Sequence, residues 1–312
     1  MLVDIQPQQE CTIERDGVRI AFQGFGDGLR SLLLLPTWSI VHSDFWRAQV
    51  PHLMSRYRLI TFDGRGNGAS DRPEDVDSYT GGVMVEDALA VLDAAGIERA
   101  AVLSVSLGAY WAALLAANAP DRVAASAFIA PSLPLGPQIE EWSAAVASFD
   151  TPRSRHEGWQ KWNRHYWHED WRGFLEFFFS RCFTEPDSRP YIDHFIGMGL
   201  QTTPTVIALT EDADDLDEAT ALALARAIRC PSLVIHGDED AIAPVAWGIE
   251  LASITGGELH VIRGGGHEPE LREADEVNRL LDDFLARVWP ASPKEPDRPE
   301  EGADSPRAGD GA

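Results

Sequence analysis

The sequence predicts an α/β fold with a mostly parallel central sheet, helices on both of its faces and an inserted helical cap. From residue 31 onward, unbroken apolar runs such as SLLLLP and AAVLSV alternate with segments of helical periodicity. The same rhythm returns late in the chain, with PSLVIHG at 231–237 and ELHVIRG at 258–264. Between about 134 and 228 the pattern is helical and aromatic, without strand-like alternation. Unbroken apolar strands joined by helices are typical of a parallel sheet buried on both faces.

An antiparallel hairpin is expected to open the domain. Two alternating stretches, 12–15 and 18–25, flank the turn signal Asp16-Gly17, and an Asp-Gly pair between such stretches favours a tight hairpin. The later elements follow from their apolar runs or their helical periodicity. The expected strands are 31–36, 58–63, 100–105, 123–130, 231–237 and 258–264, and the expected helices are 45–55, 83–95, 107–118, 245–253 and 275–288.

The core is expected to contain one insertion and to be followed by a tail. Residues 1–133 form its first part, 134–228 the helical cap, and 229–289 its second part. The last stretch, 290–312, is dominated by Pro, Gly, Ala, Ser and charged residues. Such a composition cannot bury enough apolar surface to fold alone. We therefore expect a disordered acidic tail.

Composition narrows the class of protein. The 312-residue chain has a formal net charge of −24, which repels nucleic acids and anionic membrane surfaces. Its 3 cysteines are too few and too scattered for a disulfide framework and suit a reducing compartment. The N-terminus lacks the pattern of a signal peptide, and no apolar run is long enough to span a membrane. These features predict a cytoplasmic protein, and they say nothing about its oligomeric state.

Ser106 is the candidate nucleophile. It lies in Ser104-Val105-Ser106-Leu107-Gly108, between the apolar run AAVLSV and an alanine-rich helical segment. A serine on a tight strand-to-helix turn exposes its hydroxyl, and the start of the helix offers free amides to an oxyanion. Gly108 matches the GxSxG pattern, whereas Ser104 replaces its first glycine. The alternative interpretation is that Ser106 only caps the helix that follows.

A histidine and an acid follow the two last predicted strands. HGDED, with Asp240, directly follows the run at 231–237, and GGGHEP, with His267, follows the run at 258–264. The chain order Ser, Asp, His is the one expected for a nucleophile elbow of this kind. His267 is therefore the expected general base and Asp240 the acid that orients it. Asp238 is the alternative acid, and Glu239 a further carboxylate nearby.

These residues resemble those of the α/β-hydrolase superfamily, over residues 10–289. The stretch Asp63-Gly64-Arg65-Gly66-Asn67-Gly68-Ala69-Ser70 is similar to the DxRGxGxS turn of that family, and VNRLLDDFL after His267 is similar to its closing helix. The resemblance implies an α/β-hydrolase fold with a nucleophile elbow and a cap domain, in a serine esterase-like hydrolase. It also implies a structural role for the turn.

The resemblance also implies where the oxyanion hole lies. The family usually carries His-Gly after the first parallel strand, and the amide of the next residue forms half of the hole. Here Pro36-Thr37 stand instead, so Trp38 is the expected donor and Thr37 the alternative. The amide of Leu107, directly after the nucleophile, is expected to be the second donor. Loss of one such donor costs roughly 100- to 1000-fold in rate.

The predicted function is hydrolysis of an ester, lactone or thioester through an acyl-enzyme on a Ser-His-Asp catalytic triad. One alternative is an acyltransferase or perhydrolase with the same triad. Another is a non-catalytic ligand-binding protein, suggested by the unusual Ser104 and Pro36. We expect no cofactor and no metal. The expected substrate is a small molecule with an ester-like bond. Its acyl or alcohol part is expected to be apolar or bulky if several cap tryptophans face the pocket, namely Trp142, Trp159, Trp162, Trp167 and Trp171.

Overall fold

The computed structural model describes residues 5–213 and 216–290, so most of the predicted tail lies outside the described residues. Within these ranges, one sheet of eight strands has the order β1-β2-β4-β3-β5-β6-β7-β8. The first two strands run antiparallel to their neighbours, and β3 to β8 are parallel. The strands are β1 (Gln9–Arg15), β2 (Val18–Phe25), β3 (Ser31–Leu34), β4 (Arg58–Phe62), β5 (Ala100–Val105), β6 (Val123–Ile129), β7 (Ser232–Gly237) and β8 (Glu258–Ile262).

The predicted hairpin is confirmed. Arg15 pairs with Val18 across a two-residue loop, in which Asp16 has a φ of 54° and Gly17 a φ of 77°. Two positive φ angles fit the tight hairpin turn that an Asp-Gly pair favours. The predicted parallel sheet is confirmed as well, and the short apolar runs form its strands.

The central parallel strands are mostly apolar because both faces of the sheet are covered, whereas the edge strand β8 is only partly buried. Leu32 and Leu34 belong to one buried cluster, and Leu33 and Leu35 to the other. Helices α1 (Val50–Leu53) and α12 (Ala274–Val288) cover the first face, where they contact each other. The second face is covered by α2 (Gly81–Ala94), α3 (Gly108–Asn118), α9 (Glu218–Ala227) and α10 (Val245–Thr255).

The helix expected at 45–55 is divided. Residues Ser43–Ala48 form a 3₁₀ helix, η1, and α1 begins only at Val50. Pro51 lies in the first turn of α1, where its missing N–H is not needed and its fixed φ suits a helix start. Three further short elements complete the core: η2 (Val76–Tyr79), η3 (Pro120–Arg122) and α11 (Pro269–Arg272).

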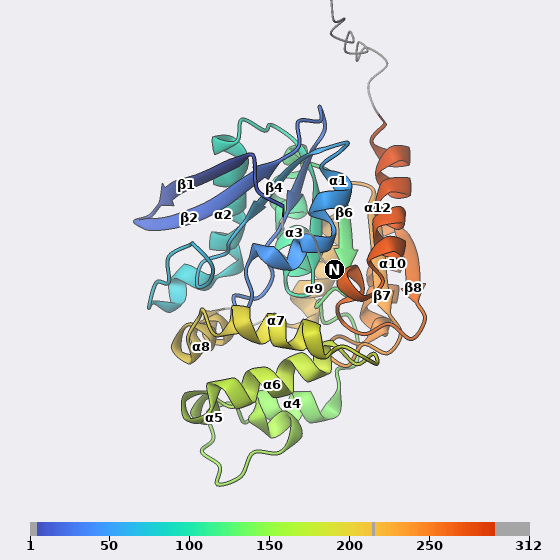
Figure 1. Ribbon diagram of the computed structural model, residues 1–312. Coiled ribbons are helices and arrows are strands. Elements are labelled where there is room, and N and C mark those ends of the chain that lie inside the picture. Colours follow the sequence, from blue (N-terminus) through green and yellow to red (C-terminus); the bar gives the residue numbers. More distant parts are fainter. Residues whose placement is uncertain (1–4, 214–215, 291–312) are drawn as a thin grey trace, which may run out of the picture.

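Between β6 and β7 the described chain is helical, without a strand. The inserted helices are α4 (Glu140–Val146), α5 (Arg164–Glu169), α6 (Trp171–Cys182), α7 (Arg189–Gly199) and α8 (Pro204–Ala213), with a 3₁₀ helix, η4 (Gly158–Lys161), between α4 and α5. They form a layer beyond one end of the sheet, at the bottom of Figure 1. Their core is aromatic, with Trp162, Trp167 and Phe174 at most 5% exposed. In contrast, α9 packs against α3 of the core.

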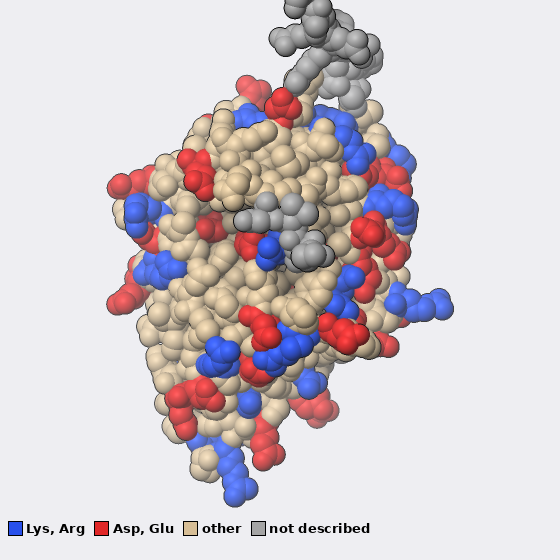
Figure 2. Space-filling model, in the orientation of Figure 1, with Lys and Arg blue, Asp and Glu red and all other residues tan. Residues whose placement is uncertain are grey.

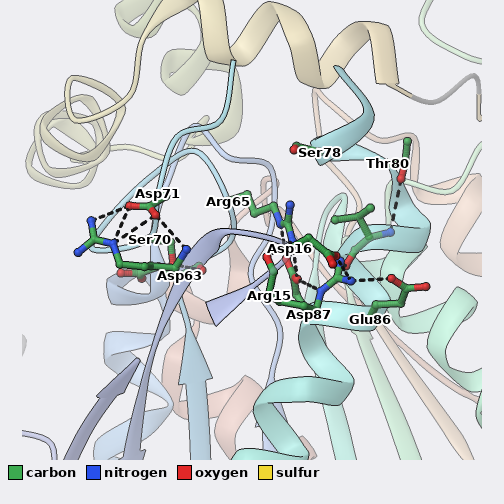
Figure 3. Close-up of polar contacts among 12 residues, drawn as sticks. Arg15, Asp16, Asp63, Arg65, Ser70, Asp71, Ser78, Thr80, Glu86 and Asp87 are labelled. Atoms are coloured by element: carbon green, nitrogen blue, oxygen red, sulfur yellow. Dashed lines mark hydrogen bonds and ion pairs between the residues drawn. The ribbon is translucent and has the colours of Figure 1, made fainter. Parts of the chain in front are cut away.

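The turn Asp63–Ser70 is held by polar contacts that Figure 3 shows in two groups. Asp63 accepts from Ser43 N at 2.9 Å and from Ala69 N at 2.8 Å. Arg65 pairs with Asp87 at 2.7 Å, and both side chains are almost fully buried. Since Asp87 lies on α2 and also pairs with Arg15 of β1, the turn joins the opening hairpin, α2 and the loop after β3. These contacts support the structural role that the sequence suggests.

Charge is distributed without a large patch of one sign on the face in Figure 2, where acidic and basic side chains are interspersed. A nucleic-acid-binding face would instead gather Lys and Arg. None of the helices within the described ranges is long and apolar enough to cross a membrane.

Candidate active site

Ser106 lies at the sharp turn between β5 and α3. Its φ is 53°, in a left-handed region that costs a non-glycine residue about 1–3 kcal/mol. Two backbone hydrogen bonds hold the turn, from Ser106 N to Ile129 O and from Ser132 N to Ser106 O, both at 3.0 Å. The strain is thus offset by contacts to β6 and to the segment after it. A strained serine here is what a nucleophile elbow requires.

The residues on either side of Ser106 explain how the elbow fits. An added Cβ at Gly108 would lie 2.6 Å from Pro36 O, so glycine is needed where the loop after β3 passes the elbow. Ser104, at the position of the first glycine in GxSxG, is fully buried. Its hydroxyl donates to Ala127 O at 3.0 Å. The neighbouring strand β6 therefore accommodates the extra side chain.

His267 lies between Ser106 and Asp240. Its Nε2 is 2.8 Å from Ser106 Oγ, and its Nδ1 is 2.8 Å from Asp240 Oδ2. The three side chains come from the loops after β5, β7 and β8, because the carboxyl ends of parallel strands meet at one edge of the sheet. His267 is 2% exposed. The structure therefore brings together the three residues that the sequence suggests.

The carboxylate of Asp240 is fully buried and well supplied with donors. Oδ1 accepts from Ile242 N at 2.8 Å and Ala243 N at 3.0 Å. Burial opposes its ionisation, but the charge of His267 and hydrogen bonds from His236 and His267 outweigh burial, so the pKa of Asp240 lies well below its usual range. An ionised Asp240 keeps the proton of His267 on Nδ1, which leaves Nε2 as an acceptor.

His236 is a residue at this site that the sequence reasoning did not single out. Its side chain is fully buried, and its Nε2 lies 3.1 Å from Asp240 Oδ2 and 3.0 Å from Ala243 O. The sequence signal that could have indicated this contact is the position of His236 four residues before Asp240 in HGDED. Asp238, the alternative acid, is exposed, and its Oδ1 accepts from Gly264 N at 2.6 Å. Asp240 is thus the carboxylate beside His267.

Ser132 is the second residue that was missed. It follows β6, and its Oγ lies 3.1 Å from Ser106 Oγ. When Ser106 donates its proton to Nε2 of His267, the hydroxyl of Ser132 is the donor in this contact. No motif marks Ser132 in the sequence, since the register of β6 beside β5 places it there. A hydroxyl at this distance makes Ser132 the obvious rival nucleophile.

Three residues were proposed for the oxyanion hole, and two loops carry them. Trp38 and Thr37 lie in the loop after β3 and are 7% and 8% exposed. Leu107 is the N-cap residue of α3, directly after Ser106. The close approach of Gly108 and Pro36 shows that these two loops touch.

A cavity of about 590 Å³ opens beside the loop that carries Asp240. Ala241 of that loop lines it together with residues of the inserted segment, whereas Ser106, Asp240 and His267 do not. Of the five tryptophans considered above, Trp159 lines this cavity, while Trp162 and Trp167 are buried in the aromatic core of the inserted helices. Both apolar and charged residues form the wall: Ile139, Glu141, Ala144, Ala145, Arg153, Glu157, Gly158, Gln160 and Arg181.

Two buried carboxyl groups, those of Glu268 and Glu270, follow His267 within three residues. Glu268 is 6% exposed and Glu270 is fully buried. Burial and the neighbouring Glu270 raise the pKa of Glu268 well above its usual range, and burial raises the pKa of Glu270 to about 7. Glu268 therefore keeps its proton near neutral pH, and neither carboxyl oxygen of Glu270 has a hydrogen-bond partner among the described residues. Ionising both groups in contact would be strongly unfavourable.

Glu270→Gln is expected to stabilise the fold at pH 8 more than at pH 5. A carboxyl whose pKa is raised by folding adds no penalty below its unfolded pKa, and its penalty grows as the pH rises through the folded value of about 7. The amide removes that penalty, which is worth on the order of 3 kcal/mol at high pH. Thermal unfolding of both proteins at the two pH values measures it.

The exposed Glu276 of α12 supplies the control for this measurement. Glu276→Gln should change the melting temperature equally at pH 5 and pH 8. An equal shift at both pH values for Glu270→Gln would contradict the raised pKa of Glu270.

The fold and this arrangement of residues define an α/β hydrolase. The chain belongs to the family with the alpha/beta hydrolase fold, whose model matches residues 23–271. The family match and the hydrolases among the relatives support hydrolysis as the class of reaction.

Curated relatives cover most of the chain. The proposed carbamate hydrolase RutD of Klebsiella pneumoniae is 28% identical over 253 residues, 80% of this chain and 88% of the relative. A 2-hydroxymuconate semialdehyde hydrolase of a Pseudomonas species is 30% identical over 247 residues, 78% of this chain and 81% of the relative. The crystal structure of a bromoperoxidase from Bacillus anthracis matches with a TM-score of 0.76 at 21% identity, over 89% of this chain and 99% of that one. At that identity the likeness concerns the fold alone.

Proposed function

We propose that this protein is a serine hydrolase that cleaves an ester-like bond through an acyl-enzyme intermediate. The observation that carries the proposal is the series Ser106, His267 and Asp240, joined by contacts of 2.8 Å at both steps. Such a series is recognised by its geometry and by the role of each member. Carboxylic esters, lactones and thioesters share the carbonyl that a serine attacks.

The reaction follows from the positions of the protons. Ser106 Oγ attacks the carbonyl carbon while its proton passes to Nε2 of His267, and the buried carboxylate of Asp240 stabilises the imidazolium. The tetrahedral intermediate then collapses, and His267 gives the proton to the leaving group. Water, deprotonated by His267, attacks the acyl-enzyme, and Ser106 leaves with the proton returned to it.

We propose that the backbone N–H groups of Trp38 and Leu107 donate hydrogen bonds to the developing oxyanion. The touching loops after β3 and at the elbow support this assignment. The start of α3 adds the partial positive charge of a helix N-terminus. Donors fixed before the reaction stabilise the charge without having to reorganise.

We also propose that the inserted helices α4–α8 form a cap that bounds the substrate site. The hydrogen bond from His267 N to Cys182 O of α6, at 3.0 Å, supports this proposal, because it holds the inserted helices beside the catalytic residues. We expect a bulky acyl or alcohol group to be preferred over acetate.

Intact-mass labelling of the wild type by a fluorophosphonate, combined with a hydrolysis panel, tests the proposal. The panel contains short and bulky carboxylic esters, a lactone, a thioester and an aryl carbamate, the last because one relative is a proposed carbamate hydrolase. We expect a single covalent adduct and turnover of at least one bulky ester. A folded protein that is neither labelled nor active would instead favour the ligand-binding alternative.

Product analysis separates hydrolysis from acyl transfer. The best substrate of the panel is incubated with and without an added alcohol or hydrogen peroxide. Free acid as the main product in both mixtures is the result expected of a hydrolase. A dominant transfer product would replace hydrolysis by the acyltransferase or perhydrolase alternative.

A further inference from the structure

Trp38 is held by the inserted helices through its side chain. The indole Nε1 donates to Thr210 Oγ1 on α8 at 2.7 Å. Thr210 Oγ1 in turn donates to Ile207 O, one helical turn earlier, at 2.7 Å. The threonine hydroxyl is therefore oriented by its own helix before it meets the indole. Trp38 belongs to the core, so this contact joins the loop after β3 to α8.

Aromatic rings hold the same indole from other sides. Trp162 stacks on Trp38 with ring centroids 5.1 Å apart and an interplanar angle of 23°. Phe178 of α6 meets it edge-on at 5.2 Å, and Trp167 and Phe174 lie at 6.2 and 6.5 Å. Trp38 is only 7% exposed. A large ring packed in this way has little freedom to rotate.

The backbone of the same loop has one more connection to the inserted helices. Asn67 Nδ2 donates to Ser39 O at 3.0 Å and to Met198 O of α7 at 3.3 Å. Asn67 thus joins the residue after Trp38 to α7. In this loop, the side chain of Trp38 contacts α6 and α8. The backbone of Ser39 is joined to α7 through Asn67.

We propose that Thr210 and Trp162 are positioning residues that hold the backbone amide of Trp38 in the oxyanion hole. This inference rests on the proposed function. The loop has Pro36-Thr37 in place of the usual His-Gly, and the contacts to the inserted helices set the place of its amide instead. A catalytic group must be held to within about 0.5 Å, and an indole fixed by a hydrogen bond and four neighbouring aromatic rings meets that demand.

The inference predicts a particular kinetic signature. The oxyanion exists in the transition state and not in the bound ester, so a displaced donor lowers kcat and leaves KM nearly unchanged. Complete loss of a donor costs roughly 100- to 1000-fold. A donor that is displaced but still present should cost less, about 10-fold.

Thr210→Val removes the hydroxyl and keeps the shape of the side chain. We expect kcat on the best ester of the panel to fall about 10-fold with KM within about 2-fold of the wild type. Thr210→Ser, which keeps the hydroxyl, should restore kcat. Ser180→Ala is the matched control, because Ser180 on α6 also donates to the carbonyl three residues earlier, Phe177 O at 2.6 Å, away from Trp38.

A trifluoromethyl ketone provides a second readout. It binds by forming a bond from Ser106 Oγ to its carbonyl carbon, with the serine proton moving to His267, and its oxygen then carries the negative charge. Its affinity should fall with Thr210→Val by the same factor as kcat. Trp162→Leu, which removes the stacked ring and keeps Thr210, should act in the same direction if Thr210→Val fails to fold.

The outcomes separate this inference from the proposed function. Variants of Thr210 and Trp162 that fold, react with fluorophosphonate and keep both kcat and ketone affinity would overturn the positioning role and leave the serine hydrolase standing. Variants of Thr210 and Trp162 that melt at a lower temperature but keep kcat and ketone affinity would also overturn the positioning role. A folded wild type without labelling or turnover would overturn both proposals.

Discussion

Replacing Ser106 by alanine is expected to lower kcat on the best ester by a factor on the order of 10⁶ and to abolish labelling by a fluorophosphonate. The attacking oxygen is lost, and no other group at the site has both a hydroxyl and a base 2.8 Å away among the described residues. Intact-mass spectrometry and initial rates measure the two effects. The protein should still fold, because alanine removes only one side-chain oxygen.

Ser104→Ala and peptide mapping of the labelled wild type are the controls for this result. Ser104 is buried in the same elbow and bonds only to the backbone of β6, so its variant should still be labelled. Peptide mapping of the wild-type adduct should place the label on Ser106 and not on Ser132, although the two Oγ atoms are 3.1 Å apart. A label on Ser132 would overturn the assignment of the nucleophile.

Asp240→Asn is expected to lower kcat by about 10⁴-fold with little change in KM. The asparagine amide can donate to Nδ1 of His267, which favours the tautomer with its proton on Nε2. That tautomer cannot accept the proton of Ser106. Steady-state kinetics measure the effect, and the far-ultraviolet circular dichroism spectrum checks the fold.

Asp238→Asn distinguishes the two acids that the sequence left open. Asp238 is exposed and bonds to the backbone of Gly264, so its asparagine variant should keep kcat within a few-fold of the wild type. Equal losses in the two variants would contradict the assignment of Asp240. A larger loss for Asp238→Asn would transfer the role to that residue.

The alternation of parallel strands and helices along the chain could be predicted because the signal is local. A strand buried on both faces must be mostly apolar, as SLLLLP and PSLVIHG are. The helix at 45–55 was the weaker case. Its apolar residues fit one helix, but the chain forms η1 and then α1, with Pro51 in the first turn of α1.

The residues missed at the site have another kind of explanation. Ser132 lies near Ser106 because β6 pairs with β5 in a particular register, and sequence spacing does not reveal register. His236 stands in a motif that was noticed, yet its contact with Asp240 depends on the turn after β7 and on Gly248 packing against its ring. Both effects combine segments far apart in the chain.

By itself, the sequence determined the sheet, its helices, the candidates Ser106 and His267, and a short list of acids. These depend on local patterns: apolar runs, turn residues and the order of motifs along the chain. Only the tertiary structure decided that Asp240 lies beside His267, that Ser132 reaches the nucleophile, and that Trp38 is gripped by Trp162 and Thr210. Those contacts join loops from different strands and helices, and their distances exist only once the strands have paired and the helices have packed.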